Sequence, residues 1–110
     1  MNDKMYALQD TKFKGFITWM EKGVGAIMLF TRGEKAEEYR QRVYPTRPLD
    51  VYAIDKHRAK DFVASMVNAN IDYAVIDVPW QHTDVDGLHE DEVVRNYAIV
   101  DLRTLHARMS

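Results

Sequence analysis

The sequence has 110 residues, of which 46% are hydrophobic, and this predicts a single globular domain over residues 1–110. It contains no cysteine, which excludes disulfide frameworks, thiolate metal sites and cysteine nucleophiles. The formal net charge of −2 argues against a protein that binds nucleic acid through overall positive charge. The longest apolar run, Ala26–Phe30, is too short to cross a bilayer, and the N-terminus lacks a secretion-signal pattern. We therefore expect a cytoplasmic protein without membrane association.

The N-terminal segment predicts a leader followed by a short helix. Met1–Thr11 is interpreted as the leader. Phe13, Phe16, Ile17 and Met20 then fall at positions i, i+3, i+4 and i+7, which is the spacing of one apolar helix face. We expect an amphipathic helix here, as an extra N-terminal element of the fold.

The segment Gly23–Gly33 has an ambiguous apolar pattern. Val24, Ile27 and Met28 fit a continuation of the preceding helix, whereas a glycine-bounded run of about seven residues has the length of a buried strand. We favour the strand because two glycines precede the run and one follows it.

Glu34–Tyr44 is predicted to be a helix. Glu34 and Glu37 lie where the helix dipole favours negative charge, and Arg40 and Arg42 lie where it favours positive charge. The two prolines that follow favour an extended link rather than further helix.

The stretch Leu49–Pro79 predicts a strand–helix–strand unit. Asp55 can cap the helix by accepting hydrogen bonds from its first free N–H groups. The segment Asn68–Asn70 suits the end of the helix, and Ile71–Val78 is rich in β-branched residues and tyrosine, as strands are. The apolar stripe of the helix comprises Ala59, Phe62, Val63, Met66 and Ala69.

The C-terminal part predicts a polar loop, a strand and a short helix. Trp80–Glu92 forms the loop, Val93–Val100 the strand, and Asp101 can cap the final helix. Together the elements predict an α+β domain with a small mixed β-sheet and helices packed on one face. Their order is βαβαββα, preceded by the extra N-terminal helix.

Two groups of polar residues raise the possibility of an enzyme. His57 and Asp61 lie four residues apart on the predicted central helix, the spacing of an acid–base pair, but no nucleophile accompanies them, and we interpret them as exposed. The loop carries candidate ligands for Zn or Mn at His82, Asp84, Asp86 and His89. Their spacing does not match the EF-hand calcium loop. We therefore favour a polar loop without a cofactor, and the alternative is a metal-dependent enzyme or binder that uses the His82–Glu90 loop.

A second possibility is direct binding of nucleic acid. Five cations surround the Glu34–Tyr44 helix, and Tyr39 and Tyr44 are interleaved with them. Arginine with aromatic stacking is one way to hold a single strand. These candidate residues are Arg32, Lys35, Arg40, Arg42, Arg47 and Tyr39. Three glutamates dilute the positive charge, so a solvated amphipathic helix is the favoured interpretation.

The segment Leu49–Met109 resembles the PcfB-like relaxosome accessory proteins of Gram-positive conjugative elements. The resemblance lies in the strands DVYAID and IDYAVID, the helix KHRAKDFVASMVNAN between them, and the final YAIVDLRTLHARM. AIMLFTRGEKAEEY resembles an earlier strand and helix of that family. The resemblance implies a non-enzymatic adaptor of a mobile element that binds a relaxase or a coupling protein.

The leading hypothesis is therefore a non-enzymatic protein of a plasmid, conjugative element or phage. It would bind a nucleic-acid-processing protein, such as a relaxase, coupling protein or nuclease, as adaptor or inhibitor. An acidic loop can imitate phosphates and occupy a basic groove. The predicted partner-binding residues are Trp80, Asp84, Asp86, Glu90, Asp91 and Glu92. The sheet edge at the last strand makes a homodimer plausible.

Overall fold

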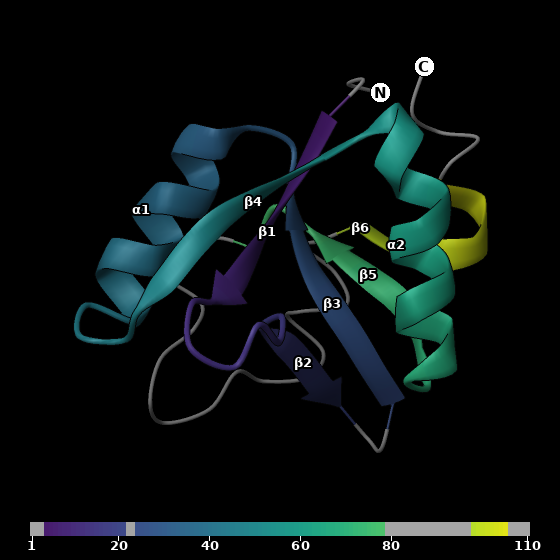
Figure 1. Ribbon diagram of the computed structural model, residues 1–110, viewed down its shortest axis with the longest axis horizontal. Coiled ribbons are helices and arrows are strands. Elements are labelled where there is room, and N and C mark those ends of the chain that lie inside the picture. The colour runs from purple at the N-terminus through teal and green to yellow at the C-terminus, as the bar shows by residue number, and fades with distance from the viewer. Residues whose placement is uncertain (1–3, 22–23, 79–97, 106–110) are drawn as a thin grey trace.

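The computed structural model describes residues 4–21, 24–78 and 98–105, which form a mixed β-sheet with one α-helix on each face (Figure 1). In chain order the elements are β1 (Lys4–Asp10), β2 (Thr18–Glu21), β3 (Val24–Phe30), α1 (Gly33–Val43), β4 (Leu49–Asp55), α2 (Lys56–Asn68), β5 (Ile71–Ile76), β6 (Ala98–Asp101) and the 3-10 helix η2 (Leu102–Thr104).

The strands of the sheet lie in the order β4-β1-β3-β5-β6, and β2 pairs with β3 beside this path. β3 and β5 run parallel, and the other pairs are antiparallel. β1 and β2 share one edge of β3, because Ala7 lies opposite Leu29 and Thr18 lies opposite Ile27. The chain therefore leaves this edge after β1, makes a turn, and returns to it as β2.

The two α-helices cover opposite faces of the sheet. Neighbouring strand residues point to opposite faces, and in β1 Met5 packs in the cluster of α2 whereas Leu8 packs in the cluster of α1. The predicted α+β class with a mixed sheet is confirmed, but the prediction of helices on one face is wrong. The link β3–α1–β4 crosses β1 in one direction and β4–α2–β5 crosses it in the other. Crossovers of the same hand that run in opposite directions place their helices on opposite faces.

The element predictions for the middle of the chain are confirmed, but Ala69, predicted in the apolar stripe of the helix, is exposed and follows the end of α2. Gly23–Gly33 contains the strand β3, and α1 follows it. The Asp55 carboxylate accepts a hydrogen bond from the Arg58 N–H at 2.8 Å and so caps α2. After α2, Asn70 adopts the left-handed conformation with φ 65° and turns the chain into β5.

The predicted N-terminal helix and leader are wrong. Lys4–Asp10 is β1, which lies between β4 and β3 in the sheet, and Thr18–Glu21 is β2. Between them the Asp10 carboxylate accepts hydrogen bonds from the N–H groups of Lys12 and Phe13 at 2.8 and 2.9 Å. This side chain closes a turn where the apolar spacing predicts a helix.

The C-terminal predictions are tested in part. Residues 98–101 form β6, and the Asp101 carboxylate accepts a hydrogen bond from the Arg103 N–H at 2.8 Å at the start of η2. Leu102 and Leu105 are buried beneath α2. The loop of residues 80–92 lies outside the described residues. Within the described ranges, no helix has the length and apolarity that a membrane span requires.

Candidate functional site

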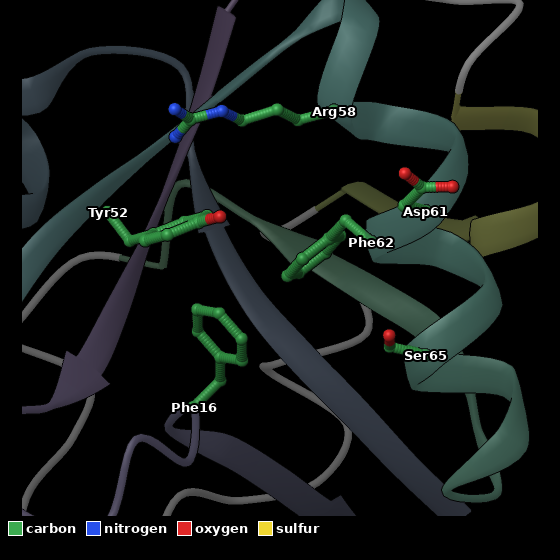
Figure 2. Close-up of a pocket in the computed structure, with 6 residues that line it drawn as sticks. All are labelled: Phe16, Tyr52, Arg58, Asp61, Phe62 and Ser65. Carbon is green, nitrogen blue, oxygen red and sulfur yellow. The ribbon is translucent and has the colours of Figure 1, made fainter.

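A pocket of about 280 Å³ opens between α2, β4 and the turn that joins β1 to β2 (Figure 2). Its apolar wall consists of three rings, which belong to Phe16, Tyr52 and Phe62. Its polar lining consists of Arg58, Asp61 and Ser65 of α2. The pocket therefore combines side chains from three parts of the chain that lie far apart in the sequence.

Helix α2 supplies four lining residues from one side. Arg58, Asp61, Phe62 and Ser65 stand at i, i+3, i+4 and i+7, which places them along a single strip of the helix. The hydrogen bond from the Arg58 N–H is the main reason that the pKa of Asp55 lies below its ordinary value. The charged cap in turn fixes the first turn of α2, from which the Arg58 side chain extends.

The Phe16 ring packs edge to face against the rings of Tyr52 and Phe62. The ring centroid of Phe16 lies 5.3 Å from that of Tyr52 and 5.2 Å from that of Phe62, with interplanar angles of 74° and 84°. These are the geometries that aromatic pairs favour. Phe16 reaches this position because it forms an isolated β-bridge with Gln9, which folds the turn back along β1. In Figure 2 the rings of Tyr52 and Phe62 lie above that of Phe16.

The charged groups lie at the mouth of the pocket. The Arg58 guanidinium carbon lies 5.8 Å from the Tyr52 ring centroid, within range of a cation–π interaction. Arg58, Asp61 and Ser65 are exposed, whereas Phe62 is buried. The site thus offers an apolar floor and both signs of charge at its rim, which suits binding of a large apolar group with polar neighbours.

The pocket lining contains neither a histidine nor a lysine, so general acid–base catalysis there would rest on Asp61 and the Tyr52 hydroxyl. Asp61 and His57 are both exposed, as predicted, and His57 does not line the pocket. Over the part of the chain that the structure describes, no group of three or more potential metal ligands occurs. The candidate metal ligands and the predicted partner-binding residues, all in residues 80–92, lie outside that part and stay predictions.

The structure separates the residues predicted to hold nucleic acid around α1. Tyr39 is only 1% exposed and packs against Phe30, with ring centroids 5.4 Å apart, so its ring is not available for stacking on a base. Lys35 pairs with Asp77 at 3.1 Å. Arg40 forms an ion pair with Glu37, and Arg47 lies 3.5 Å from the Asp10 carboxylate. Arg32 and Arg42 are exposed at opposite ends of the helix. Tyr39 therefore supplies no stacking platform, and the second interleaved tyrosine, Tyr44, is half-buried.

A further polar cluster joins the ends of the parallel strands. The Asp77 carboxylate accepts hydrogen bonds from the Thr31 N–H at 2.8 Å, from the Thr31 hydroxyl at 2.7 Å and from the Lys35 ammonium at 3.1 Å. Asp77 itself is left-handed, with φ 57°. Because both carboxylate oxygens are engaged within the fold, the cluster fastens β5 to the start of α1 and has a structural role.

The sequence interpretation missed most of the pocket. The spacing of Arg58, Asp61 and Ser65 on a predicted helix is a signal for a shared polar strip, whereas the prediction pairs Asp61 only with His57. The apolar spacing places Phe16 on a helix face, so its contact with Tyr52 has no counterpart in the sequence pattern. The chain matches no protein-family model and no curated protein.

Proposed function

We propose that the protein is a non-enzymatic binding protein and that a partner protein inserts an apolar side chain into the pocket formed by Phe16, Tyr52 and Phe62. The observation that carries this proposal is the aromatic floor bordered by exposed Arg58 and Asp61. Tyrosine and arginine are over-represented among the residues that dominate protein–protein binding energy.

The size of the pocket supports a side chain as its occupant. A volume of about 280 Å³ lies just below the range of roughly 300–1,000 Å³ that is usual for small-molecule sites. The rim charges can pair with polar groups that flank the inserted side chain. A protein segment provides both parts, an apolar anchor and polar neighbours.

Among partner classes, we propose a nucleic-acid-processing protein of a mobile element, with this protein acting as its adaptor or inhibitor in the cytoplasm. The resemblance of Leu49–Met109 to relaxosome accessory proteins supports this class. The acidic residues of Asp84–Glu92 support it independently, because negative charge complements a basic nucleic-acid groove. A relaxase, a coupling protein and a nuclease are the partners to expect.

The test is an affinity capture from the native host, followed by reconstitution with the purified partner. Ser65→Arg fills the pocket without removing a core side chain, and Ala64→Arg places the same group on the neighbouring exposed position outside it. We expect the wild type and Ala64→Arg to bind the partner and Ser65→Arg to lose it.

Binding that survives Ser65→Arg would contradict the role of the pocket. Replacing the five acidic residues of Asp84–Glu92 by amides then tests the second surface with the same purified partner. A captured partner without any role in nucleic-acid processing would contradict the proposed class while leaving the pocket result standing.

A further inference from the structure

Two neighbouring loops present aromatic and basic side chains on one surface. The first is the turn Thr11–Gly15 between β1 and β2, and the second is the link Tyr44–Pro48 between α1 and β4. They are joined because the Thr11 N–H donates a hydrogen bond to the Pro48 carbonyl at 2.9 Å. We give the name Phe13 surface to the exposed side chains of Lys12, Phe13, Lys14 and Arg47 together with the half-buried Tyr44.

Phe13 is 77% exposed, which is the highest value among the large apolar side chains whose burial the structure describes. Its exposure does not result from a loose loop. The buried Asp10 carboxylate accepts hydrogen bonds from the N–H groups of Lys12 and Phe13, and the Asp10 N–H donates to the Gly15 carbonyl at 2.8 Å. The turn therefore holds the ring outward at little further entropic cost on binding.

A cation lies over each of the two aromatic rings of this surface. The Lys12 ammonium lies 5.4 Å from the Phe13 ring centroid, and the Arg47 guanidinium carbon lies 5.7 Å from the Tyr44 ring centroid. Lys14 lies on the same turn as Lys12 and, with Arg47 on the neighbouring link, brings the exposed cations of the surface to three. The carboxylate that contacts Arg47 belongs to Asp10, which is buried behind the turn.

We infer that the Phe13 surface binds single-stranded nucleic acid. An exposed ring offers a stacking face to an unpaired base, and cations beside it can contact the phosphates on either side of that base. A duplex keeps its bases stacked on one another, so a single ring on a loop has no base face to meet there. The surface shares Tyr44 and Arg47 with the residues predicted around α1 and shares none with the pocket.

The test is the binding of a fluorescently labelled oligothymidylate of about 12 nucleotides to the full-length protein, measured by anisotropy at several salt concentrations. Three phosphate contacts predict a slope of about −2 for log K against log salt, since each contributes about 0.7 on a single strand. Phe13→Ala should weaken binding about tenfold or more and leave the slope unchanged, because it removes stacking and no charge.

A matched pair of double variants separates local from overall charge. Lys12→Gln with Lys14→Gln should bring the slope about 1.4 closer to zero. Lys56→Gln with Lys60→Gln removes the same charge from exposed positions of α2, and we expect it to leave both affinity and slope unchanged.

Several results would overturn the inference. They are absence of binding at low salt, equal effects of the two lysine pairs, an unchanged affinity in Phe13→Ala, and duplex binding as tight as single-strand binding. Binding to vesicles rich in phosphatidylserine without binding to the oligonucleotide would also overturn it. The assay contains no partner protein, so a negative result leaves the proposed partner binding untouched.

Discussion

The ring contacts of Phe16 allow a quantitative test of how the pocket is built. Phe16→Leu removes the edge-to-face contacts with Tyr52 and Phe62, whose ring centroids lie 5.3 and 5.2 Å from that of Phe16. The leucine that replaces the ring is still a large apolar side chain. Each aromatic pair contributes about 0.5–1.5 kcal/mol beyond the burial of its area. We therefore expect the free energy of unfolding to fall by about 1–3 kcal/mol.

The measurement is urea unfolding followed by far-ultraviolet circular dichroism, with Phe16→Leu, Phe62→Leu and the double variant forming a cycle. The coupling energy of this cycle reports the Phe16–Phe62 contact and should be about 0.5–1.5 kcal/mol. The control is Phe13→Leu, on the same turn and 77% exposed, which should change stability by no more than about 0.5 kcal/mol.

Two outcomes would refute this reasoning. A coupling energy below about 0.3 kcal/mol is within the error of additivity and would mean that the two rings do not stabilise each other. A loss in Phe13→Leu as large as that in Phe16→Leu would assign the effect to the turn as a whole rather than to the ring contacts.

Three other side chains give further predictions. The hydrogen bond from the Phe13 N–H, and to a lesser degree that from the Lys12 N–H, holds the pKa of Asp10 below its ordinary value of 3.8. The ionised Asp10 therefore stabilises the fold above pH 3.8, and this stabilisation is lost as the pH falls through the pKa of the folded state. Asp10→Asn should therefore reduce the decrease of the melting temperature on acidification below about pH 4, and an unchanged pH profile would contradict this. Asp77→Ala should lower the free energy of unfolding by about 1–3 kcal/mol, because the Thr31 N–H and hydroxyl lose their acceptor. Asp77→Asn retains an acceptor and tolerates φ 57°, so its loss should be smaller. Equal losses in the two variants would refute the structural role of the Asp77 hydrogen bonds. Asp55→Ala removes the cap of α2 and should cost about 0.5–2 kcal/mol in the same urea assay, and wild-type stability would show that the cap is dispensable.

The elements that the sequence predicted correctly are those fixed by local chemistry. Asp55 can cap α2 whatever the rest of the fold does, and the spacing of Phe62 and Met66 specifies the buried side of that helix. Asn70 and the β-branched run that follows it specify a turn and then β5. None of these features requires knowledge of a distant residue.

The first strand could not be recognised in this way. β1 lies inside the sheet with both faces covered, so Met5, Ala7 and Leu8 are all buried and the strand shows no alternation of apolar and polar residues. The following Phe13–Met20 spacing fits a helix, but the hydrogen bonds of Asp10 and the pairing of β2 with β3 determine the structure. Pairing with a distant strand here outweighs the helical spacing of the apolar residues.

The placement of the helices depends on strand order, which local patterns do not contain. α1 and α2 have similar lengths and each has a buried side, so their sequences are compatible with one shared face. The two crossovers run in opposite directions because β4 lies on the far side of β1 from β3, and β5 lies on the far side of β3 from β1. This strand order determines which face each helix covers.

The turn centred on Asp10 links the two proposed binding surfaces. Asp10 fixes the backbone at Phe13, which points to solvent, and the bridge between Gln9 and Phe16 returns the chain so that the second ring enters the pocket. The two phenylalanines, three residues apart, thus contribute to two different surfaces. Their spacing predicts instead that they share one face of a helix. A variant that loosens this turn should weaken both pocket and nucleic-acid binding, whereas Phe13→Ala and Ser65→Arg should each affect one alone.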